Sequence, residues 1–150
     1  MKFGEKPISK CIGDLLVHSV KLPDGKLPKG TSLSKAHIQK LRSVGITSLL
    51  VASLEEGDVD ENLAAKLLSN AFKKIGFHLS VPATGRVNFI AEKLSIARLD
   101  VEKIKRLNEI DEAITFATVL PDQLLVKGQM LATLKIIPYA VSQNSIDEAL

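Results

Sequence analysis

The sequence predicts an α+β protein, with a small βαβα-like first lobe over residues 1–76 and a β-rich second lobe with short helices over residues 77–142. Apolar residues make up 45% of the 150-residue chain and charged residues 25%, as in an ordinary globular protein. In the first half, segments with helical spacing of apolar residues alternate with runs of branched apolar residues. In the second half, runs of β-branched and aromatic residues predominate. A chain of this length can bury a core without disulfides or metals.

The first strand and helix of the first half are marked by local signals. IGDLLVHSVKL (residues 12–22) is rich in branched apolar residues and predicts a strand, and ITSLLVASL (residues 46–54) predicts another. Between them, Ser34 is placed to cap a helix over residues 35–44. Gly45 is placed to end that helix in the left-handed conformation. The order of these signals predicts a strand, a helix and a second strand.

A second amphipathic helix is expected from about Asp60 to Lys74. Asp58 or Asp60 would cap it, and Lys73 and Lys74 favour its carboxyl end, where the helix dipole is negative. Gly76 terminates it, which closes the first lobe.

The second lobe is expected to be mainly β. Gly85 predicts a turn, and a turn at Lys127-Gly128 divides the apolar segment 124–141 into a hairpin or corner followed by a long strand. The remaining elements predicted here are a strand over residues 77–81, a short helix over 87–93, a strand over 94–99, a helix over 101–110 capped by Asp100, and a strand over 113–120. The polar tail, residues 143–150, is expected to fray or to belong to a linker.

The composition argues against several classes of function. The net charge is only +3, acidic and basic residues are interspersed, and Trp is absent, so the sequence does not predict a nucleic-acid-binding surface. The single cysteine, Cys11, cannot form an internal disulfide, which fits a reducing compartment. No apolar run approaches the roughly 20 residues of a membrane helix, and the first residues do not read as a secretory signal. We therefore expect a cytoplasmic protein.

The residue types that usually carry catalysis are scattered. His18, His37 and His78 lack the spacing of a zinc site. His18 and His78 are expected to be partly buried, and His37 exposed. Cys11 has no activating neighbour and is expected to be an inert, buried thiol. No glycine-rich phosphate-binding motif occurs, so the sequence predicts no catalytic residue and no metal site.

The most distinctive polar segment is PATGRVN, residues 82–88. Thr84, Gly85, Arg86 and Asn88 combine a turn with hydrogen-bond donors, and an arginine can hold a phosphate or carboxylate through two parallel hydrogen bonds. Lys135 lies in the apolar segment TLKIIPY, where a cation needs a partner. If Arg86 and Lys135 converge, they form an anion-binding site.

An alternative explanation of these two cations is structural. Arg86 would then pair with a carboxylate, with Asp111 or Glu112 as candidates for an internal ion pair. Lys135 would extend its ammonium group to water from an edge strand. The sequence leaves both explanations open.

The segment LPKGTSLSKAHIQKLRSVGITSLLV, residues 27–51, resembles part of the molybdopterin molybdotransferase family (MoeA and gephyrin). There a similar unit lies just before the molybdopterin-binding domain. The matching positions are Gly30, Thr31, Leu33, Ile38, Leu41, Gly45, Ile46 and Val51. More widely, GDLLVHSVKL, TGRVNFIAE, LNEIDEAITFATV and VKGQMLATLKIIPYAV occur in an order similar to that in the N-terminal region of bacterial molybdopterin-binding proteins.

This resemblance implies a non-catalytic N-terminal region of a molybdopterin-binding protein that acts in molybdenum cofactor biosynthesis. It implies molybdopterin as the parent protein's cofactor, and a downstream molybdopterin-binding domain as partner, often followed by a nucleotidyltransferase domain. The family's "TGdE" and "GGxSxGD" segments are absent, so it transfers no catalytic residue to this chain. Two alternatives stay open. In one, the chain forms part of a transferase site that downstream domains complete. In the other, the chain is an oligomerisation or docking module.

Overall fold

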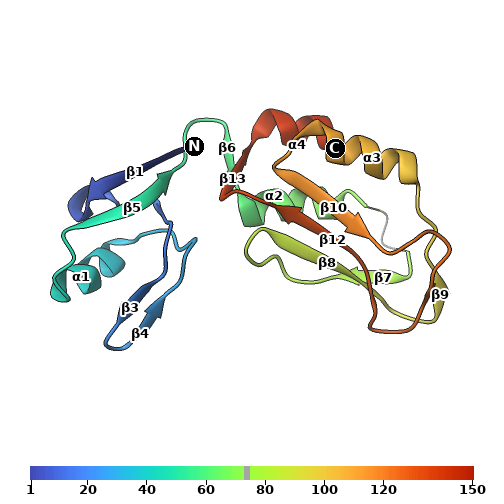
Figure 1. Ribbon diagram of the computed structural model, residues 1–150, viewed down its shortest axis with the longest axis horizontal. Helices are drawn as coiled ribbons and strands as arrows, with labels where there is room; N and C mark the ends of the chain where they lie inside the picture. Colours follow the sequence, from blue (N-terminus) through green and yellow to red (C-terminus); the bar gives the residue numbers. More distant parts are fainter. Residues whose placement is uncertain (73–74) are drawn as a thin grey trace. The chain divides into compact units, whose positions relative to one another are not determined.

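The computed structural model describes residues 1–72 and 75–150 and divides the chain into two compact units, residues 1–58 and 59–150 (Figure 1). The described residues form helices and short strands gathered into several small sheets, which confirms the α+β class. The division falls after Asp58 rather than after residue 76, because the helix that follows packs entirely within the second unit. None of the described helices is long and apolar enough to cross a membrane.

The first unit is built on a three-stranded antiparallel sheet in the order β1-β5-β2. Its elements are β1 (Lys2–Pro7), η1 (Ile8–Lys10), β2 (Leu15–Leu16), β3 (Val20–Leu22), β4 (Gly25–Leu27), α1 (Lys35–Ser43) and β5 (Ser48–Ser53). Strands β3 and β4 form a separate hairpin. The core of this unit contains Cys11, Leu16, Leu33, Leu41 and Val51, each at most 1% exposed.

The local signals around α1 are confirmed. The Ser34 hydroxyl accepts a hydrogen bond from the His37 N–H at 3.3 Å, and the Ser34 N–H donates to His37 Nδ1 at 3.2 Å. This reciprocal pair is a capping box in which histidine replaces the usual glutamate or glutamine. Gly45 follows the helix with φ +81°. His37, which was expected to be exposed, is half-buried because it serves this cap.

The single strand predicted over residues 12–22 is wrong. Leu15 and Leu16 pair with β5, the chain then bends, and Val20–Leu22 pairs instead with β4. The bend leaves His18 exposed rather than partly buried. A run of branched apolar residues indicated extended backbone correctly but could not show that its two ends have different partners.

The second unit is a four-stranded antiparallel sheet in the order β10-β12-β8-β7, with helices on one face (Figure 1). The sheet strands are β7 (Phe77–Leu79), β8 (Arg86–Ala91), β10 (Ile114–Thr118) and β12 (Met130–Ile136), and the helices are α2 (Glu61–Asn70), α3 (Val101–Ile110) and α4 (Gln143–Ala149). Two small ribbons pair β9 (Ser95–Ile96) with β11 (Leu124–Leu125), and β6 (Asp58–Asp60) with β13 (Ala140–Ser142).

The helix-covered face of this sheet carries the unit's main core. Phe89, at 1% exposed, lies at its centre, with ring centroids 5.1 Å from Phe72, 5.3 Å from Phe77 and 5.2 Å from Phe116. Phe72 also stacks on Phe116 at 4.8 Å. Contacts of this geometry add to the stabilisation that comes from burying the rings.

Several caps and strands in this unit were predicted correctly. Asp60 caps α2 by accepting hydrogen bonds from the N–H groups of Asn62 and Leu63, and Asp100 caps α3. The strand predicted over residues 113–120 is β10, and Gly128 turns the chain with φ +86°. Helix α2 ends at Asn70, and the predicted helix-end residues Lys73 and Lys74 lie outside the described residues.

Two predictions for this unit are wrong, and two others hold only in part. Residues 87–93 are not a helix, because β8 occupies most of this segment and its side chains alternate strictly between the two faces of the sheet. Of residues 94–99, only Ser95–Ile96 pairs as a strand. The tail is ordered as α4, since the Ser142 hydroxyl caps it and Ile146 is fully buried. The long strand predicted after the Lys127-Gly128 turn is β12, which ends at Ile136 rather than near residue 141. It stops shortly before Pro138, which has no N–H to donate to a ladder.

Candidate anion-binding site

The PATGRVN segment forms a tight hairpin turn between β7 and β8. Ala83 and Arg86 exchange both backbone hydrogen bonds, at 3.0 and 3.1 Å, around Thr84 and Gly85. Both central residues have positive φ, +48° for Thr84 and +68° for Gly85, as in the type I′ turn that suits the twist of a hairpin. Thr84 donates its hydroxyl proton to the Ala83 carbonyl at 2.8 Å, so it serves the turn itself.

Gly85 is required at this turn for space as well as for its backbone angles. A Cβ atom there would lie 2.6 Å from the Ile136 carbonyl oxygen and 2.9 Å from Oε2 of Glu61. The Gly85 N–H donates to Oδ1 of Asn62 at 3.1 Å. The turn is therefore held tightly against the start of α2 and the end of β12, which fixes the backbone position of the next residue, Arg86.

Arg86 and Lys135 are brought together by the register of the sheet. They are direct partners across β8 and β12. The Ile136 N–H donates to the Gly85 carbonyl at 2.8 Å just beyond them, which makes Arg86 and Lys135 the close, non-hydrogen-bonded type of pair. In such a pair the two Cβ atoms are about 4.5–5.5 Å apart and point to the same face. The two side chains therefore leave adjacent positions on the open face of the sheet, opposite the helices.

Polar side chains continue this open face on both sides of the pair. Thr115 on β10 is the partner of Lys135. Asn88 faces Thr133, whose hydroxyl donates to Asn88 Oδ1 at 2.9 Å. Of the five residues singled out from the sequence, Arg86, Asn88 and Lys135 thus share one face, while Thr84 and Gly85 shape the turn beside it.

The internal ion pair considered for these cations is not formed in the described part of the chain. The carboxylate of Asp111 accepts from the Ala113 N–H at 2.9 Å and from the Ser145 hydroxyl at 2.5 Å, so it anchors α4 instead. Within residues 1–72 and 75–150, neither Arg86 nor Lys135 has a carboxylate within ion-pair distance. Like charges directly opposite each other destabilise a sheet, so the pairing of Arg86 with Lys135 is expected to have an electrostatic cost.

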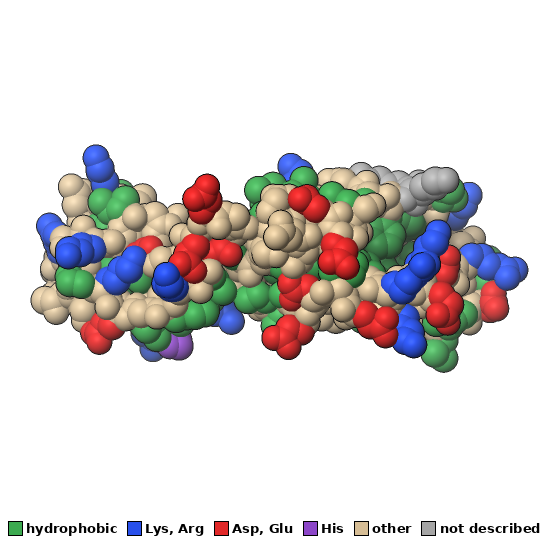
Figure 2. Space-filling model, turned by 90° about the horizontal axis from the view of Figure 1, so that it is seen from above, with side chains coloured by type: hydrophobic (Ala, Val, Ile, Leu, Met, Phe, Trp, Pro, Cys, Tyr) green, Lys and Arg blue, Asp and Glu red, His purple; other side chains and the backbone are tan. Residues whose placement is uncertain are grey.

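The charge of the chain is divided unevenly between the units. The first unit holds nine of the 20 basic and six of the 17 acidic residues, and the second unit holds the remaining eleven of each. Figure 2 shows acidic and basic side chains interspersed over the second unit. The Arg86–Lys135 pair is therefore a local concentration of positive charge on a unit without net charge.

The other candidate groups do not form a reactive site. Cys11 is fully buried and its thiol lies 3.3 Å from the Pro7 carbonyl, and burial followed by the charge of Asp14 raises the pKa of this thiol. His78, expected to be partly buried, is exposed on β7. Burial, and then the charge of Glu61, raises the pKa of Tyr139. No group of three or more metal-ligating side chains occurs among the described residues.

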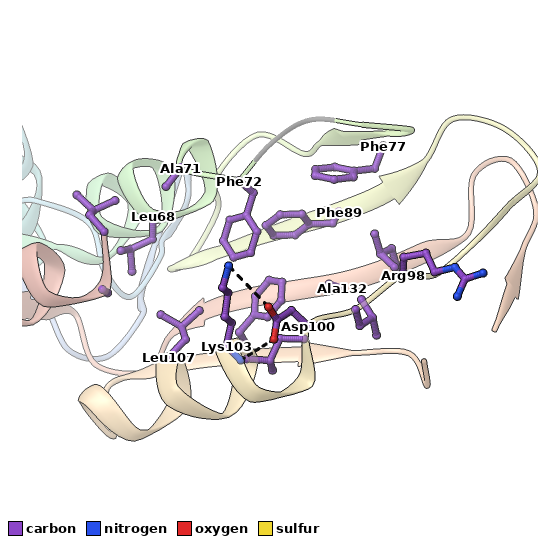
Figure 3. A pocket seen from close by; sticks show the side chains of 16 residues that line it. Leu68, Ala71, Phe72, Phe77, Phe89, Arg98, Asp100, Lys103, Leu107 and Ala132 are labelled. Atoms are coloured by element: carbon purple, nitrogen blue, oxygen red, sulfur yellow. Dashed lines mark hydrogen bonds and ion pairs between the residues drawn. The ribbon is translucent and has the colours of Figure 1, made fainter. Parts of the chain in front are cut away.

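A concave site lies on the other, helix-covered side of the sheet, and no sequence motif indicates it. This groove has a volume of about 630 Å³ and opens between α2, α3 and the carboxyl end of α4 (Figure 3). Its walls are the rings of Phe72, Phe77, Phe89 and Phe116, and Lys103 and Asp100 lie at its mouth. A possible signal was the placement of four of the five phenylalanines in the second unit.

Comparisons with models of protein families, with characterised proteins and with solved structures found no significant match for this chain.

Proposed function

We propose that the chain is a non-catalytic binding region, and that the open sheet face of its second unit holds the anionic group of a ligand. The observation that supports this proposal is the direct pairing of Arg86 with Lys135, without a carboxylate partner among the described residues. A phosphate bound between them would offset their mutual repulsion and accept hydrogen bonds from the guanidinium group, the ammonium group and the Thr115 hydroxyl.

The resemblance of residues 27–51 to molybdopterin molybdotransferases suggests the ligand. Molybdopterin carries a phosphate, so we propose that the region contributes to holding molybdopterin or a close intermediate in a molybdenum cofactor biosynthesis protein. In the parent protein it would act beside a downstream molybdopterin-binding or nucleotidyltransferase domain. The chemistry would then belong to that domain.

The test is titration of the chain with molybdopterin and, separately, with inorganic phosphate, followed by backbone amide NMR. We expect shifts at residues 84–88 and 133–135, and we expect Arg86→Ala to weaken binding by roughly 1.5–3 kcal/mol, the cost of removing a charged hydrogen-bond donor. The control is Arg106→Ala, an exposed arginine on α3. Equal affinity for the Arg86→Ala and Arg106→Ala proteins would overturn the proposal.

A second candidate function, self-association, is favoured by the β9–β11 ribbon. Ile96 and Leu124 are direct partners on its outer face and are 52% and 60% exposed, and the neighbouring Leu94 and Val126 are 66% and 57% exposed. An uncharged antiparallel ribbon has a local two-fold axis, so it suits the same ribbon of a second copy. Light scattering over a concentration series should show a dimer that the Ile96→Ser, Leu124→Ser double variant loses, and a monomer at all concentrations would exclude this function.

A further inference from the structure

The side chain of Asn88 lies on the same open face as Arg86, one step further along β8. We propose that its amide group is the specificity-determining contact of the anion-binding site, and that the site selects a phosphate monoester whose organic part carries a carbonyl or amide oxygen. This inference rests on the proposed function, because it takes the phosphate to be held by Arg86 and Lys135. It adds which phosphate-bearing ligands the face accepts.

The backbone of Asn88 is fixed by the chain segments on both sides. Its N–H donates to Oγ of Ser80 at 2.9 Å, and its carbonyl accepts from the Ser80 N–H at 2.9 Å. On the other side, Asn88 is the direct partner of Thr133 on β12. Only the side-chain amide of Asn88 is therefore available to a ligand.

Thr133 sets the orientation of that amide. The Thr133 hydroxyl donates to Oδ1 of Asn88 at 2.9 Å, whereas the Val87 carbonyl lies farther from it, at 3.5 Å. A hydroxyl has one proton to donate, so the shorter contact receives it. With Oδ1 held toward Thr133, the Nδ2 group points the other way and has no acceptor among the described residues.

The stability of the sheet does not require an amide at position 88. A serine or threonine there could also form a cross-strand hydrogen bond with Thr133. The amide adds two N–H donors that the described fold does not use, on a half-buried side chain. Arg86 and Lys135 likewise have donors but no acceptor in their side chains. A ligand that matches this face therefore offers acceptors to the paired cations and to Asn88.

The spacing of the donors defines the ligand further. Residues two positions apart in a strand are about 6–7 Å apart, so Asn88 lies about that far from Arg86 along the sheet. The next residue of β8 on this face is Ile90, whose side chain has no polar atom. Asn88 is thus the last side-chain donor of β8 on the open face. Inorganic phosphate is too small to contact both the paired cations and Asn88, whereas a phosphate ester with an acceptor in its organic part can contact both.

The test compares N-acetylphosphoethanolamine with 4-methylpentyl phosphate. Both are phosphate monoesters of the same length and shape, and the first has an amide where the second has only carbon. Both compounds, and inorganic phosphate, are titrated into the whole chain by calorimetry and by NMR of the Asn side-chain amide signals. We expect the acetyl compound to bind about 5-fold more tightly than the alkyl compound, as one neutral hydrogen bond provides. It should also shift the Asn88 side-chain signals.

Variants at two positions assign this preference to the oriented amide. Asn88→Ala should lower the ratio of the two affinities about 5-fold, because it removes the donor. Thr133→Val removes the orienting hydroxyl and should lower the ratio about 2-fold or more, whereas Thr133→Ser keeps the hydroxyl and should retain the ratio. The matched control is Asn144→Ala, an exposed asparagine on α4, which should leave the ratio unchanged.

The outcomes separate this inference from the proposed function. If none of the three phosphates binds, or if all bind equally to the Arg86→Ala and Arg106→Ala proteins, the proposed function fails and this inference fails with it. If inorganic phosphate binds through Arg86 but the two esters bind equally, only the role of Asn88 is overturned. The same follows if Asn88→Ala and Asn144→Ala give the same ratio. An unchanged ratio in Thr133→Val would overturn the orientation of the amide by Thr133.

Discussion

The two faces of the four-stranded sheet in the second unit are built from alternate residues of the same strands, yet they differ in burial. Along β8, Val87, Phe89 and Ala91 are buried under the helices, whereas Arg86 and Asn88 point away from them. One face stabilises the fold through packing. The other contributes little packing and carries two like charges side by side, so selection for stability does not explain it.

The comparison predicts that substitutions on the two faces have very different effects. The largest effect is expected for Phe89→Ala, since this ring is 1% exposed and contacts three other rings. We expect a loss of about 3–5 kcal/mol in the free energy of unfolding, measured by urea denaturation. Thr115→Ala, on the open face, should change it by no more than about 0.5 kcal/mol. Similar losses for the two variants would contradict the division between the faces.

The Gly85 turn joins the two faces and is the next most sensitive position. Gly85→Ala places a methyl group 2.6 Å from the Ile136 carbonyl oxygen in a backbone with φ +68°. We expect a loss of about 2–4 kcal/mol, because the positive φ costs about 1 kcal/mol and the close approach adds strain. Gly128→Ala is the matched control, since its φ is +86° and no atom lies within 4 Å of the added carbon. It should cost only about 1 kcal/mol.

The edge of β10 provides a third, smaller test, because there an exposed side chain stabilises the buried face. Asn108 supplies both hydrogen bonds that a neighbouring strand would make to Phe116. Asn108→Ala should cost about 1–2 kcal/mol and should expose a sheet edge, so aggregation on storage should increase. Arg106→Ala, on the same helix, should change neither the free energy of unfolding nor the aggregation. Unfolding and light-scattering measurements check both expectations.

These contrasts explain what the sequence could predict and what it could not. Caps and turns depend on neighbouring residues, and Ser34, Gly45, Asp60 and Asp100 act as predicted. The helix predicted over residues 87–93 was wrong. The alternation of apolar and polar residues in VNFIAEK is too short to be distinguished from helical spacing.

The candidate site was predictable only in its residue types. PATGRVN supplied the donors and a glycine. The pairing of Arg86 with Lys135, however, depends on the register between β8 and β12, which joins residues 49 positions apart in the sequence. Register is set by the whole sheet and not by local sequence. The Phe groove was missed for the same reason, since its walls come from α2, β7, β8 and β10. The helix α4 was also missed, because the core that buries Ile146 is built mainly from residues far from it in the sequence.

The smallest predicted effect tests whether the open face sacrifices stability for binding. Lys135→Gln removes one of two like charges that lie directly opposite each other, so the free energy of unfolding should rise by about 0.2–0.5 kcal/mol at low salt. The gain should disappear near 1 M salt, where charges are screened within about 3 Å. Arg86→Gln should give a similar gain, and the double variant should give less than the sum, since the repulsion can be removed only once. Phosphate affinity should fall in all three proteins. Urea denaturation at two salt concentrations measures the first effect, and phosphate titration measures the second. If Lys135→Gln destabilises the protein at low salt, the lysine contributes to the fold, and the charge pair then gives no argument for a ligand.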